Sequence, residues 1–328
     1  MKVKILGTGR ALPARSLHSA DPEIAGIPGG TACSVGVERR FVCENETQVD
    51  LAAQACSHAL EAADVPAAAI DLVISGSAVP YQPIPAMAPL VMRDLGIPDG
   101  AAAAFDINST CLSFVSALEM AARMIEGRAV KRALVFSAEV ASRALPWQAQ
   151  PDVAALFGDG AAAAVLAASD PGERSEIKAV RLRTHPSGYE ACSIGAGGTR
   201  YDLEAEQETF MANSKFTMQG KTLFRLASRH FAGFVEDLLS DAGWQRSDVD
   251  LVVPHQASPA ALEHMIHQTG FKRDRVLRIA ARFGNQIAAS IPFGLDLARE
   301  QGRVSPGKRV LLLGTSAGVS FGGAALVV

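Results

Sequence analysis

Three residues in this chain, Cys111, His255 and Asn285, have side chains that together could carry out thioester chemistry. Each follows a short apolar run, so each is expected where a buried strand ends and a helix begins, the place where α/β proteins gather ligands. A cysteine at a helix start feels the positive end of the helix dipole, which lowers its pKa and favours the nucleophilic thiolate. A neutral imidazole can donate a hydrogen bond or exchange a proton, whereas asparagine is a permanently neutral donor that cannot act as a base. The pattern predicts an acyl group held on Cys111 and a second carbonyl that becomes negatively charged beside His255 and Asn285.

Other residues have weaker patterns, and Cys111 itself could be structural, because unpaired cysteine often behaves as a small buried hydrophobe. His264 and His267 could bind a metal only with a third ligand that the sequence does not reveal, so we expect two surface histidines and no metal. We expect Asp159 and Glu139 to satisfy buried backbone groups. Three further features have structural interpretations: a packed loop position for Trp147, and close backbone approach for the glycines of GDGAAA and GTSAG.

Composition restricts the class of protein. The 328 residues are 48% hydrophobic and carry a net charge of −3, with no basic run, which argues against nucleic acid or an anionic membrane as the main partner. The first residues contain too short an apolar stretch for a secretory signal, and no window of about 18 uncharged apolar residues occurs, so we expect a cytoplasmic protein. The five cysteines are scattered without a C-x-x-C pair, so we expect reduced thiols: Cys33, Cys43, Cys56, Cys111 and Cys192.

The chain repeats itself. LEAADVPAAAIDLVISGSA (60–78) resembles LSDAGWQRSDVDLVVPHQA (239–257), FDINSTCLSFVSALEMA (105–121) resembles FGNQIAASIPFGLDLA (283–298), and KRALVFSAE resembles KRVLLLGTS. These matches occur in one order at offsets of 177 to 179 positions, as Asp71 and Asp250 or Lys131 and Lys308 show. The offsets predict two related halves, residues 1–170 and 171–328, and place Cys111 opposite Ala289.

Within each half, uninterrupted apolar strands alternate with helices. Strands apolar on both faces indicate mostly parallel sheets covered on both sides, and hence an α/β fold. We expect helices over 48–63, 112–127, 220–240 and 288–301. The polar, glycine-rich region 168–219 is expected to connect the halves and to form a covering loop.

The motifs NSTCLSF, LFGDGAAA, VVPHQAS, FGNQIAASIP and GTSAGVSFGGAALVV resemble those of the β-ketoacyl-ACP synthase III branch of the thiolase superfamily, over nearly the whole chain. The resemblance implies a thiolase fold, a homodimer of five-layered α/β/α/β/α subunits, and an acyltransferase with acyl-CoA or acyl-ACP substrates and no cofactor. Cys111 would accept the acyl starter, and the backbone N–H groups of Cys111 and Ala317 would form the oxyanion hole. His255 and Asn285 would bind the malonyl thioester carbonyl as carbon dioxide leaves, giving a 3-oxoacyl product.

Single residues distinguish the rival branches. GTSAG stands where thiolases carry a second active-site cysteine, and Asn285 stands where elongating synthases carry a second histidine. Synthases that join two acyl chains head to head take a glutamate base from a loop that here holds no carboxylate between Ser75 and Val91. A non-decarboxylating acyltransferase and a non-catalytic acyl-binding module also remain possible on the same fold.

The substrate regions depart from the family pattern. The tryptophan and arginine that clamp adenine in members using short acyl-CoA starters are absent from this chain. Ile84 occupies a loop that the resemblance places in the partner subunit, at a position where a phenylalanine often limits chain length. We therefore expect a medium-length acyl donor. For docking of the acidic acyl carrier protein, Arg225 matches a family position, Lys221 and Arg229 lie on the same helix, and Ala260 replaces an expected arginine.

Overall fold

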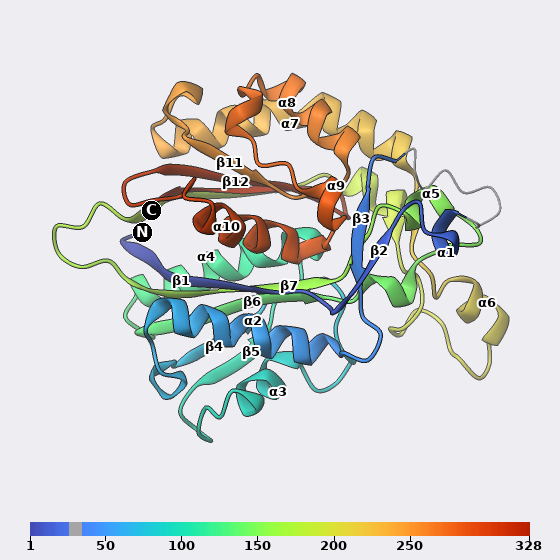
Figure 1. The fold of residues 1–328 in the computed structure, drawn as a ribbon, viewed down its shortest axis with the longest axis horizontal. Helices are drawn as coiled ribbons and strands as arrows, with labels where there is room; N and C mark the ends of the chain where they lie inside the picture. The colour runs from blue at the N-terminus through green and yellow to red at the C-terminus, as the bar shows by residue number, and fades with distance from the viewer. Residues whose placement is uncertain (26–34) are drawn as a thin grey trace.

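The protein is built in five layers, as the resemblance to the thiolase superfamily implies. The computed structural model describes residues 1–25 and 35–328, so Cys33 lies outside the described residues. Helices α2 (Gln48–Ala63) and α3 (Met87–Asp94) cover the outer face of one sheet, and α7 (Gly220–Ala242) and α8 (Pro259–Thr269) cover that of the other. Helices α4 (Ser113–Glu126) and α10 (Ser290–Glu300) lie between the two sheets (Figure 1). The largest apolar cluster fills this central layer and takes side chains from both halves.

The two sheets have matching strand orders. The first is ordered β1 (Val3–Ala11), β7 (Gly160–Ala168), β6 (Arg132–Glu139), β4 (Leu72–Ser75) and β5 (Ala103–Asp106). The second is ordered β8 (Glu176–Thr184), β13 (Ser320–Val327), β12 (Arg309–Ser316) and β11 (Leu251–Pro254). A single parallel bridge between Val252 and Val276 occupies the place that β5 takes in the first sheet. Every strand of the first sheet precedes residue 170 and every strand of the second follows it, although the domain boundary itself stays a prediction.

The expectation of mostly parallel sheets is wrong. The pairs β4 with β5, β4 with β6 and β11 with β12 are parallel, whereas β1 with β7, β6 with β7, β12 with β13 and β8 with β13 are antiparallel. A strand covered on both faces is apolar throughout whichever way it runs, so its sequence does not reveal its direction.

The duplication extends to individual hydrogen bonds. The Asp71 carboxylate accepts from the backbone N–H of Arg132 at 2.9 Å, and Asp250 accepts from that of Arg309 at the same distance. Helices α4 and α10 each follow a short 3₁₀ turn, Thr110–Leu112 in one half and Ile287–Ala289 in the other. These turns align Cys111 with Ala288, so the predicted alignment with Ala289 is off by one residue.

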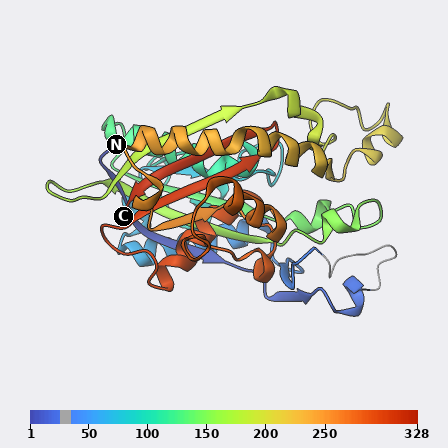
Figure 2. The same ribbon diagram turned by 90° about the horizontal axis from the view of Figure 1, so that it is seen from above.

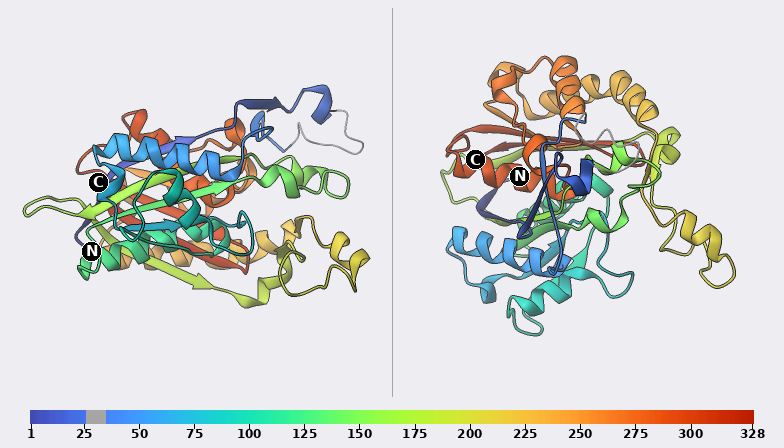
Figure 3. Two further views of the ribbon diagram at one scale, coloured as in Figure 1. Left: turned by 90° about the horizontal axis from the view of Figure 1, so that it is seen from below. Right: turned by 45° about the vertical axis from the view of Figure 1, so that its right-hand side comes forward.

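The region 168–219 contains more structure than a connection. It includes β8, the paired short strands β9 (Cys192–Ser193) and β10 (Thr217–Met218), and α6 (Gln207–Ala212). The chain from β9 to β10 projects at one end of the molecule together with α1 (Pro22–Ala25), α5 (Pro151–Ala154) and the β2 (Arg15–His18) and β3 (Arg39–Val42) pair (Figures 2 and 3). Both termini lie at the opposite end. Across the described residues, no helix has the length and apolar character needed to cross a membrane.

Candidate active site

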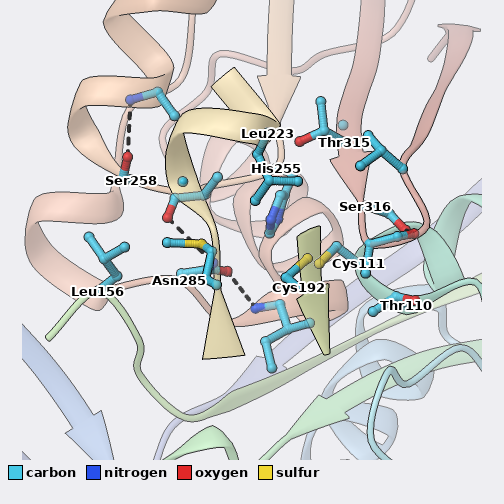
Figure 4. Close-up of a pocket in the computed structure, with 18 of the residues that line it drawn as sticks. Thr110, Cys111, Leu156, Cys192, Leu223, His255, Ser258, Asn285, Thr315 and Ser316 are labelled. Carbon is cyan, nitrogen blue, oxygen red and sulfur yellow. Dashed lines mark hydrogen bonds between the residues drawn. The ribbon is translucent and has the colours of Figure 1, made fainter. Parts of the chain in front are cut away.

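Cys111, His255, Asn285 and Ala317 line one cavity of about 500 Å³. Cys111 lies in the 3₁₀ turn before α4, His255 follows β11, Asn285 follows α9 (Ala280–Phe283), and Ala317 follows β12. Figure 4 shows Cys111 and His255 projecting into the same space, from the turn before α4 and from the end of β11. The structure therefore brings together residues that are up to 206 positions apart in the chain.

A glycine and a serine hold the Cys111 turn against β12. A Cβ added at Gly314 would lie 2.9 Å from Leu112 Cδ2 and 3.2 Å from the His255 Cβ, so glycine allows both segments to approach the strand. The Ser316 hydroxyl then donates to the Ser109 carbonyl at 2.9 Å. These contacts agree with the expectation that GTSAG serves close backbone approach.

Asn285 is oriented by the backbone that follows it. Its Oδ1 accepts a hydrogen bond from the Ile287 N–H at 2.8 Å, which directs Nδ2 toward the cavity side, where it lies 3.4 Å from the Ala257 carbonyl. Asn108 makes the same turn in the first half, accepting from Thr110 N–H at 2.9 Å. Because Oδ1 is already engaged, the side chain offers the cavity an N–H donor.

The Cys111 thiol does not have the lowered pKa that its position predicts. Burial, together with the nearby Cys192 and Glu139, raises its pKa to about 12. The backbone N–H groups of Ala317 and Cys111 act in the opposite direction, because they stabilise the thiolate. Helix α4 begins only at Ser113, and the surrounding apolar side chains outweigh the favourable backbone dipoles. The two N–H groups expected to form the oxyanion hole thus both act on the Cys111 sulfur.

His255 is neutral at physiological pH. Its side chain is 6% exposed, and burial lowers its pKa to about 4, a shift that a hydrogen bond with the Ile287 backbone only partly opposes. Its Nδ1 is buried and makes no hydrogen bond within the described part of the chain. A neutral ring with unused hydrogen-bonding capacity suits a donor or a proton carrier better than a permanent charge.

The cavity wall is almost entirely apolar. No Asp, Glu, Lys or Arg occurs among the described residues that line it. One part is formed by Leu145, Leu156, Phe157 and Phe216, and another by residues of α7 and α8. Phe224 of α7 lines the cavity and is 56% exposed, so this part reaches the surface. An apolar cavity with a few convergent polar groups is typical of a site that binds a mostly apolar small molecule.

The other predicted site residues lie outside the cavity. Ile84 is 87% exposed and contributes nothing to the cavity of its own chain. Lys221, Arg225 and Arg229 are exposed on α7, next to the cavity-lining Leu223 and Phe224, and none has an ion-pair partner among the residues described.

The residues expected to be structural have structural contacts. Asp159 accepts from Cys43 N–H and from Ser142, and Glu139 accepts from Ala78 N–H at 2.6 Å. Trp147 packs in a small apolar cluster with Leu17, Ile24 and Ala155. His264 is not the expected surface histidine: it lines the cavity, and its Nε2 is hydrogen-bonded to the Ser228 hydroxyl at 2.9 Å. His267 is exposed, as expected. Within the described ranges, no group of three metal-binding side chains occurs.

Sequence reasoning missed Cys192. It comes from β9 of the covering segment, and its sulfur faces that of Cys111 in the cavity (Figure 4). Its sequence, EACSIGAGG, has neither helical nor strand periodicity, so no pattern indicates where it lies.

The geometry can be compared with known proteins. The family model described as 3-oxoacyl-[acyl-carrier-protein (ACP)] synthase III matches residues 105–186, and its C-terminal counterpart matches residues 239–328. Beta-ketoacyl-[acyl-carrier-protein] synthase III 3 of Streptomyces coelicolor is 36% identical, over 98% of this chain and 96% of that protein.

Solved structures give the same result. The 3-oxoacyl-[acyl-carrier-protein] synthase III of Aquifex aeolicus has a TM-score of 0.86 at 30% identity, covering 99% of this chain and all of that one. The priming β-ketosynthase of the R1128 polyketide biosynthetic pathway has a TM-score of 0.88 at 27% identity, covering 99% and 96%. With both halves matched and the two predicted hydrogen-bonding side chains on the same cavity as the cysteine, the chain belongs to the β-ketoacyl-ACP synthase III family.

Proposed function

We propose that this protein condenses an acyl starter with a malonyl thioester and releases a 3-oxoacyl thioester. The observation that carries the proposal is the convergence of a cysteine, two backbone N–H donors, a neutral histidine and an oriented asparagine on one apolar cavity. The synthase III relatives from Streptomyces coelicolor and Aquifex aeolicus, which span nearly the whole chain, support the same reaction.

In the first step the Cys111 sulfur attacks the thioester carbonyl of the donor. The carbon–sulfur bond to the carrier breaks, and the departing thiolate takes the proton that Cys111 loses. The N–H groups of Cys111 and Ala317 would stabilise the oxyanion that forms on the way, since both already act on the sulfur.

In the second step the malonyl thioester loses carbon dioxide and becomes an enolate. His255 and Asn285 would donate hydrogen bonds to the enolate oxygen, and the enolate carbon would attack the acyl group on Cys111. The new carbon–carbon bond replaces the bond to sulfur, and the released thiolate takes a proton from water. Because decarboxylation supplies the carbanion, the step needs neither a carboxylate base nor a cofactor. This agrees with a cavity whose described lining has no carboxylate and disfavours the head-to-head reaction.

We also propose that the malonyl group arrives on acyl carrier protein and that the protein works as a homodimer. The exposed cations of α7 beside the cavity support the first point. The exposure of Tyr81 and Ile84 in one loop supports the second, because a partner subunit would cover these apolar side chains.

Intact-mass measurement after incubation with acyl thioesters tests the acylation step. We expect one acyl group per chain, lost in C111A and kept in the control C43A, whose cysteine does not line the cavity. Acylation of C111A to the wild-type extent would contradict the assignment of the nucleophile.

The same measurement separates the two steps. In H255A and N285A we expect acylation of Cys111 to persist, while condensation falls about a hundred- to a thousandfold, the usual cost of one oxyanion donor. H267A is the matched control, because His267 is exposed and does not line the cavity. Equal loss of acylation and condensation in both variants would contradict this division. Wild-type transfer of the acyl group to an alcohol or amine, without use of malonyl thioester, would instead identify an acyltransferase.

A further inference from the structure

One reactive side chain in the cavity has no part in the proposed reaction. Cys192 is partly buried, lines the cavity and faces Cys111 in Figure 4. Cys192 is also close enough to Cys111 to raise the pKa of that thiol, because a negative charge on Cys192 would disfavour the Cys111 thiolate. Two free thiols 81 positions apart in the chain therefore face each other in one cavity.

The other described cysteines are excluded from this pair. Cys56 is fully buried in α2. Cys43 directly follows β3, and its backbone N–H donates to Asp159. Neither cysteine lines the cavity. Among the cysteines that the structure describes, Cys111 therefore has Cys192 as its one thiol neighbour in the site.

The strand that carries Cys192 can adjust without disturbing either main sheet. β9 pairs only with β10, through Ser193 with Thr217 and Cys192 with Met218. A disulfide needs Cα atoms within about 7 Å and a specific dihedral angle, so a small local movement is often required. Because β9 belongs to neither main sheet, such a movement would leave the hydrogen bonds of both main sheets intact.

We propose that Cys111 and Cys192 form a reversible disulfide when the protein meets a peroxide. The Cys111 thiolate attacks one peroxide oxygen, the O–O bond breaks, and Cys111 becomes a sulfenic acid. The Cys192 sulfur then attacks the sulfenic sulfur, an S–S bond forms and water leaves. Together the two thiols lose two electrons and two protons, and one hydrogen peroxide becomes two waters.

This disulfide would have two consequences. It removes the nucleophile, and it joins the turn before α4 to the covering segment, so the acyl site is closed while the oxidant persists. It also protects Cys111, because a sulfenic acid without a neighbouring thiol proceeds to sulfinic acid, which thiols do not reduce. The pair would thus be an oxidation site that switches the enzyme off without destroying it.

Peptide mapping tests the proposal without relying on enzymatic activity. Reduced protein is treated with hydrogen peroxide, its remaining thiols are blocked with N-ethylmaleimide, and it is digested with trypsin. We expect a cross-link between the peptides spanning 94–123 and 184–200, which hold Cys111 and Cys192, and its disappearance after dithiothreitol. The peptide 41–93, which holds Cys43 and Cys56, is an internal control that should stay alkylated.

Two variants provide the contrast. In C192A and C192S, peroxide should leave Cys111 irreversibly oxidised. Dithiothreitol should therefore return Cys111 to a thiol that N-ethylmaleimide can alkylate in the wild type but in neither variant. No cross-link in the wild type, a cross-link to another cysteine, or equal recovery of Cys111 in the wild type and both variants would overturn the proposal.

Discussion

The raised pKa of Cys111 gives the acylation step a defined pH dependence. The reactive form is the thiolate, and with a pKa near 12 its fraction is small at neutral pH and rises about tenfold with each pH unit. We therefore expect the rate of Cys111 acylation to increase steadily from pH 6 to pH 8, without a plateau. Rapid-quench mixing followed by intact-mass measurement gives this rate, with C111A as the background.

The condensation step should behave differently. His255, with a pKa lowered to about 4, stays neutral over the same range, so condensation from protein acylated beforehand should change little between pH 6 and pH 8. An acylation rate that levels off between pH 6 and 7 would instead indicate a cysteine–histidine ion pair and contradict the burial argument.

At the residue scale, the sequence predicted which side chains form the site better than it predicted which side chains surround them. Cys111, His255 and Asn285 could be selected because each follows an apolar run. The direction of the Cys111 pKa shift could not be predicted, because the apolar side chains that line the cavity with Cys111, such as Leu156 and Phe216, come from distant segments. Cys192 was missed because the sequence around it has no periodicity that indicates where it lies.

At the scale of elements, α7 provides a second prediction. Its first half contributes Leu223 and Phe224 to the cavity and exposes three cations beside them. If these cations bind an acidic carrier protein, R225A and K221A should raise the KM for malonyl-ACP several-fold, with a weaker dependence on salt than in the wild type. Their kcat should stay unchanged, because the cations do not line the cavity.

Two controls make the docking test specific. R246A removes an exposed cation that lies beyond the end of α7 and pairs with Glu236, and it should leave KM unchanged. A malonyl thioester of pantetheine alone lacks the carrier, so R225A should use it as well as the wild type does. A KM increase with pantetheine of the same size as with the carrier would exclude a docking role.

The helices that the sequence predicts lie close to their expected positions. The expected ranges 48–63, 220–240 and 288–301 agree with α2, α7 and α10 to within two residues at each end, because each has a clear apolar face. Strand β8 was missed, since the alternating charges of EIKAVRLRT in an edge strand look like a polar connection. The antiparallel pairs were missed because apolar composition carries no information about direction.

For the whole molecule, the duplication explains why two similar halves make one site. Asn108 and Asn285 make the same turn, but Ala288 stands opposite Cys111, and the offset of 179 places Gly76 at the position of His255. A Cβ at Gly76 would lie 2.8 Å from the Ser113 carbonyl oxygen, so no histidine fits there. The first half therefore supplies the nucleophile and the second supplies the donors.

The last prediction concerns the far end of the acyl pocket, which we expect the partner subunit to close. Ile84 is 87% exposed in its own chain, so an effect on chain length would have to act across a dimer interface. With isoleucine in place of phenylalanine, the pocket should hold several more methylenes, each worth about 0.8 kcal/mol, or roughly fourfold in binding. We expect hexanoyl to decanoyl thioesters to outcompete acetyl-CoA, and I84F to shift the preference toward short chains.

Mixed dimers distinguish action across the interface from action within one chain. When C111A/I84F is paired with wild type, the single working Cys111 belongs to a chain with isoleucine at position 84, and its partner carries the substitution. Short-chain preference in this dimer, and wild-type preference when C111A is paired with I84F, would show that the loop acts in trans. The reverse result would place Ile84 in its own pocket and contradict the dimer proposal. A wild-type preference for acetyl-CoA would show that other residues replace the missing adenine clamp.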